Sequence, residues 1–512
     1  MDIIGPFIGK LTQVSVRIWL HVVDEPAKLP SDHAIEVEGR LFPLTAQGFD
    51  LYSVMVADIT GLNPGRTYSY RLQRGGKPIE LPSCPDLHFA TLPSQESETW
   101  SFALMSCHNP LEFEKTHAGQ GWRVWKAMPD LLWNNKFNAN TRFAILGGDQ
   151  VYTDPKHDEL RFSTSDDERR ALLIGLYRQF WSDPAYQNVM RNLPAFMMWD
   201  DHDIYDGWGS FDINTHSEGG KVDWNGIYSS AKGAFAAFQA SRNPDPILPG
   251  DNFSFTFVHD NIGFIVPDLR TNRTYSPAQI WSASQRDSVY AWLDTEAKDL
   301  DHIFVVSTVT FFHLSKQMDN LVGTGFSFWE WLKTKFLNHQ GQDPLDEMAD
   351  DLRDSWDSDV NQPAMLDFLD RLFDWQNAKL ASTGQPRSVF ILTGDIHNAG
   401  MSDLISHKPA HSKQPFIRQI ISSPVAYVSQ PKFACALLDG LMEPCTLGGW
   451  LTCQHRHLFP QRNFSVISIE RTEEGHRRFH VKFYREGIEE PHETVLPVFP
   501  QLLERVDWKK YS

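Results

Sequence analysis

The sequence has little cysteine and no excess of positive charge. Only five of its 512 residues are cysteines, an odd and sparse set that argues against a disulfide framework. Lysine and arginine number 47 against 65 acidic residues, so the formal net charge is −18 at pH 7. General binding to nucleic acid backbones is therefore not expected, and an anionic substrate would need a local group of cations.

Long apolar runs are also absent. No stretch is long enough to cross a bilayer as a helix, and no basic segment followed by an apolar core opens the sequence. We therefore expect a cytoplasmic protein without a membrane span. Export of the mature chain and the oligomeric state stay open.

Apolar and aromatic residues are plentiful. Hydrophobic residues make up 41% of the chain and aromatic residues 12%, which is enough for a large interior and argues against global disorder. A chain of this length is too long to fold around one simple hydrophobic core, so two domains are expected.

The first part of the chain has the period of β-strands. Apolar and polar residues alternate over 14–22 and again near 52–56 and 68–72, with a turn at Leu62-Asn63-Pro64-Gly65. We predict a β-sandwich domain over residues 1–92, a polar linker over 93–98 and a second domain over 99–512. The first domain could bind a partner or polymer, but a structural module is the simpler interpretation.

Three apolar runs in the second domain end in polar tips. The runs 142–146, 196–199 and 388–392 are followed by Gly148-Asp149, Asp200-Asp201-His202-Asp203 and Gly394-Asp395-Ile396-His397. Because the carboxyl ends of strands in an α/β sheet meet at one edge, we expect these side chains to share a site. Such dense negative charge is costly to bury unless a metal ion offsets it. The sequence therefore predicts a metal centre.

Four motifs, in order along the chain, carry a resemblance to a known family. They are Ser106-Cys107, Gly148-Asp149-x-x-Tyr152, Trp199-Asp200-Asp201-His202-Asp203 and Gly394-Asp395-x-His397. In these motifs the chain resembles the PhoD-like (alkaline phosphatase D) branch of the calcineurin-like metallophosphoesterases. The resemblance extends to Asp268-Leu269-Arg270, to Asp354-Ser355-Trp356-Asp357 and to the amino-terminal β domain. It implies an α/β fold, a four-layer sandwich of two mixed sheets flanked by helices, preceded by a fibronectin type III or Ig-like β sandwich.

The same resemblance implies a binuclear or multinuclear metal site that holds iron and a divalent ion, which could be calcium, zinc, manganese or magnesium. The ligands that it implies are Cys107, Asp149, Tyr152, Asp201, Asp395 and His397. Asp149 would bridge the ions, and a thiolate with a phenolate favours iron over magnesium.

Further roles are implied for residues around the ligands. His202 would be the general acid or would stabilise the transition state, while Asp200 and Asp203 would orient the ligands. Arg270, as a phosphate clamp, and Asn109 would bind the substrate.

Plainer alternatives stay open for several of these residues. Cys107 could be a buried thiol, Tyr152 a packing residue and Arg270 one half of a surface salt bridge. We expect His108 to be a structural or supporting histidine rather than a ligand. We make no metal-ligand prediction for His313, which is displaced from the strand that precedes it.

Two features lie outside these motifs. Residues 312–366 change to a helical, irregular pattern and are expected to be an insertion, whose acidic run at 346–359 we interpret as a solvated face. We also consider a second metal site, in which a structural zinc would be held by Cys445, Cys453, His455 and His457. Their spacing fits no zinc-finger pattern.

The expected function is that of a metal-dependent phosphoesterase. It would hydrolyse phosphate mono- or diesters by attack of a metal-bound hydroxide, with diester or mixed activity favoured. One alternative is a non-catalytic binding protein that retains the metallophosphatase fold. Another is a metal-dependent hydrolase of a different ester class. The physiological substrate stays open.

Overall fold

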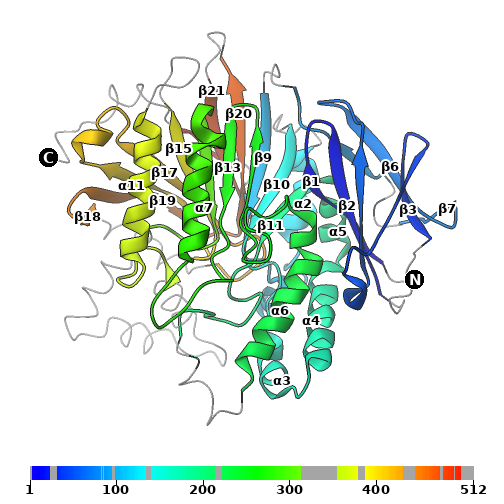
Figure 1. Ribbon diagram of the computed structural model, residues 1–512. Helices are drawn as coiled ribbons and strands as arrows, with labels where there is room; N and C mark the ends of the chain where they lie inside the picture. Colours follow the sequence, from blue (N-terminus) through cyan, green and yellow to red (C-terminus); the bar gives the residue numbers. More distant parts are fainter. Residues whose placement is uncertain are drawn as a thin grey trace.

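The structure is a computed structural model. It describes residues 3–23, 32–81, 84, 86–94, 99–133, 140–211, 213, 222–312, 354–378, 387–429, 444–472, 477–488 and 491–496. Within these residues the chain forms four β-sheets with helices between and around them (Figure 1). In this part of the chain, no helix is both long and apolar enough to cross a membrane.

The first eight strands form two antiparallel sheets at one side of the molecule (Figure 1). One sheet has the order β1 (Ile3–Leu11), β2 (Ser15–Val22), β5 (Val54–Thr60), and the other β4 (Arg40–Pro43), β3 (His33–Val37), β6 (Thr67–Arg74), β7 (Lys77–Pro78), with β8 (His88–Ala90) pairing with β6. The predicted strands at 14–22 and near 68–72 are confirmed. The strand predicted near 52 begins only at Val54, because Ser53 has the left-handed φ of 51° that ends the 3-10 helix η1 (Asp50–Tyr52).

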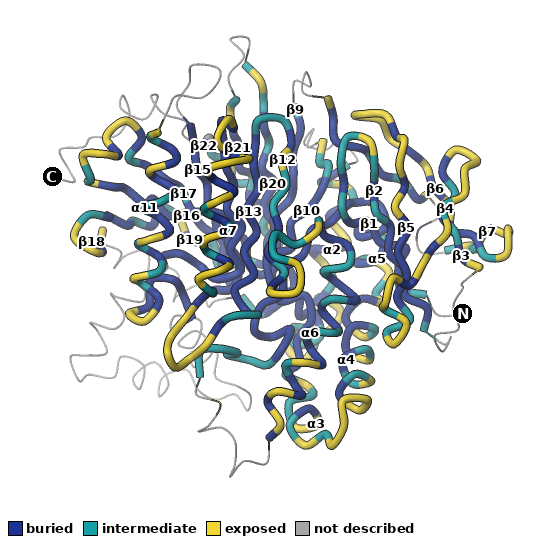
Figure 2. Tube along the Cα trace, in the orientation of Figure 1, coloured by how far each residue is buried: buried dark blue, intermediate teal, exposed yellow. Residues whose placement is uncertain are grey.

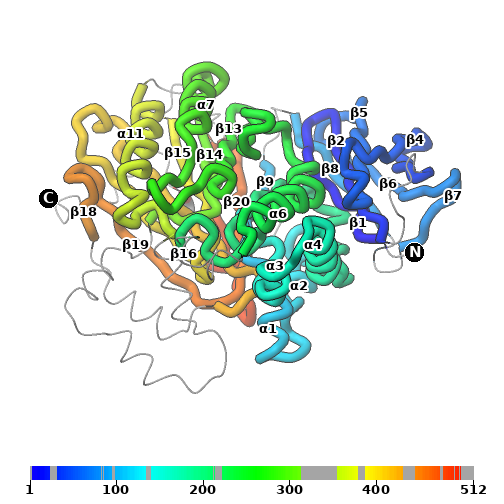
Figure 3. Tube along the Cα trace, turned by 60° about the horizontal axis from the view of Figure 1, so that its bottom comes forward, coloured from blue at the N-terminus to red at the C-terminus, as the bar shows by residue number. Residues whose placement is uncertain are grey.

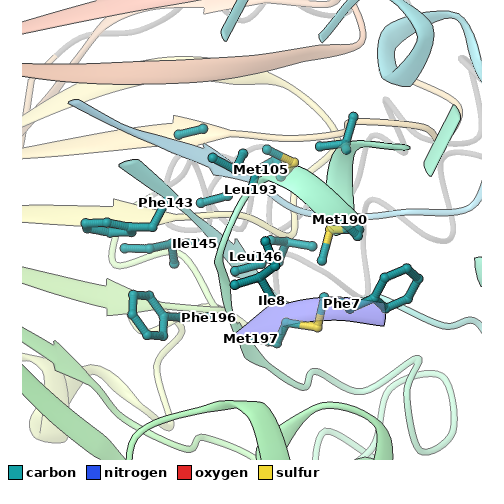
Figure 4. Packing of buried hydrophobic residues seen from close by; sticks show 14 of the residues in the cluster. Phe7, Ile8, Met105, Phe143, Ile145, Leu146, Met190, Leu193, Phe196 and Met197 are labelled. Carbon is teal, nitrogen blue, oxygen red and sulfur yellow. The ribbon is translucent and has the colours of Figure 1, made fainter. Parts of the chain in front are cut away.

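The amino-terminal sheets pack tightly against the rest of the chain. The ring of Phe7 on β1 lies 6.0 Å from that of Trp181 and 5.8 Å from that of Tyr186, centroid to centroid. Trp19 Nε1 donates to the carbonyl of Ala237 at 2.9 Å. Figure 4 shows Phe7 among buried side chains of the second part of the chain. These sheets therefore share one hydrophobic core with the α/β part.

A six-stranded sheet forms the first half of the α/β part. Its order is β11 (Ala195–Met198), β10 (Thr141–Gly147), β9 (Thr99–Met105), β20 (Asn463–Arg471), β21 (Arg477–Arg485), β22 (His492–Leu496). Strands β9, β10 and β11 are parallel, and β20 joins β9 in the antiparallel sense. Strands β20 and β21 pair as an antiparallel hairpin.

An eight-stranded sheet forms the second half. Its order is β12 (Phe255–His259), β13 (Ile262–Val266), β14 (His302–Ser307), β15 (Ser388–Thr393), β17 (Phe416–Ser422), β16 (Ala399–Ser406), β19 (Leu451–Phe459), β18 (Cys445–Leu447). Strands β13, β14, β15 and β17 run parallel to one another, and the other pairs are antiparallel. The sheet is therefore mixed.

Alternate residues of the parallel strands point to opposite faces of this sheet, and both faces are covered. Phe264 and Phe304 lie 5.4 Å and 5.2 Å from Phe102 of the six-stranded sheet, so the two sheets pack face to face. Ile265 and Val305 instead join a core that contains residues of α7 (Ala283–Asp294) and α11 (Gln362–Ala378). Figure 2 shows the central strands as buried. The fold is mixed α/β, as predicted.

The remaining helices follow the strands of the six-stranded sheet. They are α1 (Pro110–Thr116), α2 (Arg123–Leu132), η2 (Asp154–Lys156), α3 (His157–Phe162), α4 (Asp166–Trp181), α5 (Pro184–Asn192), α6 (Trp224–Phe238) and η3 (Ala240–Arg242), with η4 (Glu296–Asp299) and η5 (Pro409–His411) later in the chain. Helices α4 and α6 lie side by side (Figure 3). Ser165 caps α4, since its side chain accepts a hydrogen bond from Glu168 N at 3.3 Å. The Glu168 carboxylate accepts a hydrogen bond from Thr164 N at 2.8 Å.

The predicted insertion is described only in part. Residues 313–353 lie outside the described residues, and α11 begins within the predicted range and covers a face of the sheet. The interpretation of the acidic run as a solvated face is wrong for Asp354 and Asp357, which are buried. Two arginines pair with the Asp354 carboxylate, and the Ser355 hydroxyl donates to Asp357, so both carboxylates have partners inside the protein.

Candidate metal centre

Carboxylates from three strand ends meet in one buried group. Asp149 follows β10, Asp200 and Asp201 follow β11, and Asp395 follows β15; ligand atoms of these four lie within 4.8 Å of one another. Asp149, Asp201 and His202 form a second such group. The predicted convergence is therefore confirmed, but the strands come from two sheets that face each other rather than from one sheet edge.

The buried group has the properties of a cation site. Oδ1 of Asp149 and Oδ2 of Asp200 are buried and accept no hydrogen bond from any described residue. Burial raises the pKa of Asp149 well above its ordinary value; Asp200 and Asp201 raise it further, and His202 lowers it. Burial likewise raises the pKa of Asp200, to about 6. Since bare, buried carboxylate oxygens are costly, these residues fit a bound metal ion.

Cys107 lies directly beside the group. Its Sγ is buried 3.5 Å from Oδ2 of Asp149 and accepts a hydrogen bond from Ser423 Oγ at 3.0 Å. Burial raises the pKa of the thiol well above its ordinary value, with Asp149 and Asp395 adding to the shift. A cation beside Cys107 would favour the thiolate, and this position matches its predicted role as a ligand.

The two remaining predicted ligands, Tyr152 and His397, both contact the ring of Tyr427, and His397 is in neither of the described groups spaced to hold a metal. The Tyr152 hydroxyl donates to Asp149 Oδ2 at 3.4 Å, and its ring stacks on Tyr427, centroids 5.1 Å apart. The ring of His397 lies 4.4 Å from the same Tyr427. Burial lowers the pKa of His397 to about 3, so the ring is neutral, the form that metals bind.

The backbone is strained at four of the predicted ligands. Cys107, Asp149, Asp395 and His397 have φ values of 56°, 54°, 74° and 51°, in the left-handed region that non-glycine residues rarely adopt. A side chain at Gly148 would be strained, because φ is 103° and a Cβ would lie only 3.0 Å from Cβ of Asp200. Strain of this kind is typical of functional sites.

His202 is oriented by a residue that the sequence did not indicate. Its Nδ1 lies 3.0 Å from Oδ2 of Asp154 in η2, two residues after Tyr152. Burial lowers the pKa of His202, but Asp154 and Asp201 raise it by more, so the net pKa lies well above its ordinary value. This shift favours the protonated ring, which is the form that a general acid needs.

Asp203 has the contacts of a supporting residue. Its carboxylate accepts hydrogen bonds from Asp200 N at 3.0 Å, Val151 N at 3.1 Å and Gln239 Nε2 at 2.8 Å. These bonds tie the loop that carries Asp200 to the loop that carries Asp149, in agreement with the predicted orienting role.

The two predicted substrate contacts lie in different surroundings. Arg270 is completely buried and pairs with Asp200, Asp201 and Asp354, so the surface salt bridge considered as its alternative is wrong. Asn109 caps α1, where its side chain accepts from Glu112 N at 3.1 Å.

The neighbouring histidine is structural, as expected. His108 is buried. Its Nδ1 accepts a hydrogen bond from Trp125 Nε1 at 3.1 Å, and its ring stacks on that of Tyr186, with the ring centroids 4.8 Å apart. Burial lowers its pKa to about 3, so the ring stays neutral.

The zinc hypothesis gains no support from the structure. Cys445 lies opposite Cys453 in the β18–β19 hairpin, but His455 hydrogen-bonds Ser402. Over the described parts of the chain, the groups spaced to hold a metal contain neither these residues nor His457.

Comparison with known proteins agrees with the geometry of the centre. The match to a solved structure titled as that of PhoD covers 96% of this chain and 88% of the PhoD chain. The TM-score is 0.59 and the sequence identity 14%, which shows a shared fold. Among curated proteins, none has a significant match. A family model described as PhoD-like phosphatase matches residues 102–434, more than half of the chain. The chain therefore belongs to the PhoD-like phosphatase family.

Proposed function

We propose that this protein is a metal-dependent phosphoesterase that hydrolyses phosphate mono- or diesters, with diester or mixed activity favoured. The observation that carries the proposal is the buried group of four carboxylates, in which two oxygens accept no hydrogen bond from the described residues. Membership of the PhoD-like phosphatase family supports a phosphatase-type hydrolase.

The chain offers a donor set that suits iron with a divalent ion. The proposed ligands are Cys107, Asp149, Tyr152, Asp201, Asp395 and His397. Bound ions would supply an activated water at neutral pH and would offset the negative charge of the phosphate. Thiolate and phenolate donors suit iron, while the carboxylates suit the divalent ion.

The proposed chemistry of the chain's own residues centres on His202. Asp154 holds its Nδ1, which leaves Nε2 to deliver a proton to the leaving alkoxide. The raised pKa of His202 favours the protonated ring that this role needs.

The finer description of the fold belongs to the same proposal. We propose a four-layer α/β sandwich over residues 99–512 and a fibronectin type III-like sandwich over 1–92, with a linker at 93–98. The two antiparallel sheets within residues 3–90 and the face-to-face packing of the two larger sheets support it.

A comparison of two chromogenic esters tests the proposal. Bis-p-nitrophenyl phosphate and p-nitrophenyl phosphate report diester and monoester hydrolysis, and the ratio of their kcat/KM values gives the preference. We expect turnover of at least the diester, lost in His202→Ala by about 100-fold or more. Turnover of p-nitrophenyl acetate without either phosphate ester would contradict the proposal and favour another ester class.

A further inference from the structure

The carboxylate of Asp200 is held at one oxygen and bare at the other. Its Oδ1 accepts hydrogen bonds from Arg270 Nε and from Thr308 Oγ1, the latter at 3.0 Å. Its Oδ2 is buried and accepts none from the described residues, although Asp200 belongs to the group spaced to hold a metal. A carboxylate fixed by one oxygen has the other available for an ion.

We propose that Asp200 is itself a metal ligand, through Oδ2, and that Arg270 is a positioning residue rather than a contact to the substrate. Asp354 in turn holds Arg270. This inference rests on the proposed function, because it assigns roles within the same metal centre.

All five N–H groups of the Arg270 guanidinium can be accounted for within the protein. Nε donates to Asp200, and Nη1 donates to the carbonyl of Trp208 at 2.8 Å and to Asp354 at 3.3 Å. Nη2 donates to Asp201 at 3.2 Å and to Asp354 at 2.5 Å. A bidentate phosphate clamp needs two parallel N–H groups on one edge, and here both edges already bind carboxylates.

Asp354 is fixed from several sides, so it can hold Arg270 in place. Its carboxylate forms an ion pair with Arg273 Nη2 at 2.6 Å and accepts a hydrogen bond from the Ser210 hydroxyl. Arg273 also donates to the backbone carbonyl of Asp354 at 2.8 Å. Asp354 is only 4% exposed, and its pairing with the two arginines offsets the cost of burying its charge.

The formal charges show that the arginines offset only part of the negative charge. The carboxylates of Asp149, Asp200, Asp201, Asp354 and Asp395 contribute −5, and Arg270 and Arg273 contribute +2. The difference in formal charge is −3. Because Arg270 and Thr308 bind Oδ1 of Asp200 and leave Oδ2 bare, Oδ2 is the oxygen available to an ion.

Metal binding by the metal-free protein tests this assignment. Mn²⁺ is titrated into chelator-treated protein by calorimetry, for the wild type and for Asp200→Asn and Asp354→Asn. Removal of a partner that orients a ligand typically costs about 10- to 100-fold in metal affinity, and we expect a loss of this size in Asp354→Asn. The loss should be larger in Asp200→Asn, which removes the charge of a ligand itself. At saturating Mn²⁺, the KM for bis-p-nitrophenyl phosphate should stay within about twofold of the wild type in Asp354→Asn.

A matched control separates this effect from the general cost of breaking a buried ion pair. Glu486→Gln removes the partner of Arg462, another fully buried arginine, whose Nη2 lies 2.6 Å from Glu486 Oε1. This pair is not part of the metal centre, so Mn²⁺ affinity should be unchanged in Glu486→Gln.

Two further variants keep the test decisive if Asp354→Asn does not fold. Thr308→Val removes the second donor to Oδ1 of Asp200 with little change of volume, and Arg270→Lys keeps the charge but loses the planar fork. Both should weaken Mn²⁺ binding. Unchanged Mn²⁺ affinity with a KM raised tenfold in Arg270→Lys would instead make Arg270 a substrate clamp and overturn the inference. Absence of Mn²⁺ binding by the wild type would overturn the proposed function itself.

Discussion

Nδ1 of His202 lies 3.0 Å from Oδ2 of Asp154, a carboxylate that sits only two residues beyond Tyr152. Asp154 follows β10 and His202 follows β11, so the ends of two neighbouring strands together supply the general acid and the carboxylate that orients it. With Nδ1 bound to Asp154, the ring has a single nitrogen, Nε2, for exchange with a substrate.

Asp154→Asn should move the alkaline limb of the pH–rate profile to lower pH. Burial lowers the pKa of His202, and the Asp154 charge is the largest effect that raises it. Without that charge, His202 loses its proton at a lower pH, and the acid form needed for catalysis disappears earlier. The measurement is kcat/KM between pH 6 and 10. An alkaline limb at the wild-type position would contradict the role of Asp154.

Gly148→Ala should disrupt the metal centre. The new Cβ would meet Cβ of Asp200 at 3.0 Å and that of Thr308 at 3.2 Å, and the φ of 103° is strained for alanine. We expect Mn²⁺ affinity to fall at least tenfold. Gly487→Ala is the control, because its φ is 73° but no atom lies within 4 Å of its Cβ. Equal losses of metal affinity in both variants would rule out the steric explanation.

The metal-free protein should lose stability as the pH falls from 6.5 to 4.5. Burial lowers the pKa of six histidines strongly, to about 4 for His21, His157, His259 and His302, and to about 3 for His108 and His397. The folded state binds fewer protons than the unfolded state here, so each can reduce the free energy of unfolding by up to about 1.4 kcal/mol per pH unit.

Three carboxylates oppose this trend without cancelling it. Burial raises the pKa of Asp149, of Asp200 to about 6 and of Asp203 to about 7, so their contribution to stability is lost as the pH rises. The six histidines outnumber them. Thermal unfolding in the presence of chelator measures the sum, and a Tm that stays constant or rises towards pH 4.5 would contradict the prediction.

Phe7→Ala should destabilise the whole chain, because the amino-terminal sheets share its core. Phe7 is fully buried, stacks on Trp19 at 5.5 Å and meets Trp181 and Tyr186 of the α/β part. Truncation of a buried phenylalanine typically costs about 3–5 kcal/mol. Urea unfolding gives the value, with the exposed Leu51→Ala as a control expected within about 0.5 kcal/mol. A loss below about 1 kcal/mol would show that the two parts are only loosely attached.

The strand ends and their carboxylates could be predicted from the sequence because each tip directly follows an apolar run. Asp149, Asp200 and Asp395 are local features of this kind, and the sheets bring them together. The role of Asp354 could not be predicted, since its partner Arg270 is 84 residues away and its acidic surroundings have the composition of a solvated face.

Strands β16 and β19 could not be predicted from the sequence for a related reason. Both are polar for buried strands, and Asp403 of β16 is buried only because Arg418 on β17 and Arg456 on β19 pair with it. Such pairing across strands leaves no periodic signal in the sequence of either strand. The positive φ values at four proposed ligands are likewise a property of the folded chain.

The central claim is that the buried carboxylate group holds the metal ions that catalysis needs. The most direct measurement is the metal content of purified wild-type protein and of Asp149→Asn, by mass spectrometry, with hydrolysis of bis-p-nitrophenyl phosphate before and after chelation. We predict that wild-type protein contains bound metal, that chelation abolishes turnover and added metal restores it, and that Asp149→Asn loses metal and activity together. Full turnover in metal-free protein, or an inactive Asp149→Asn with full metal content, would contradict the account.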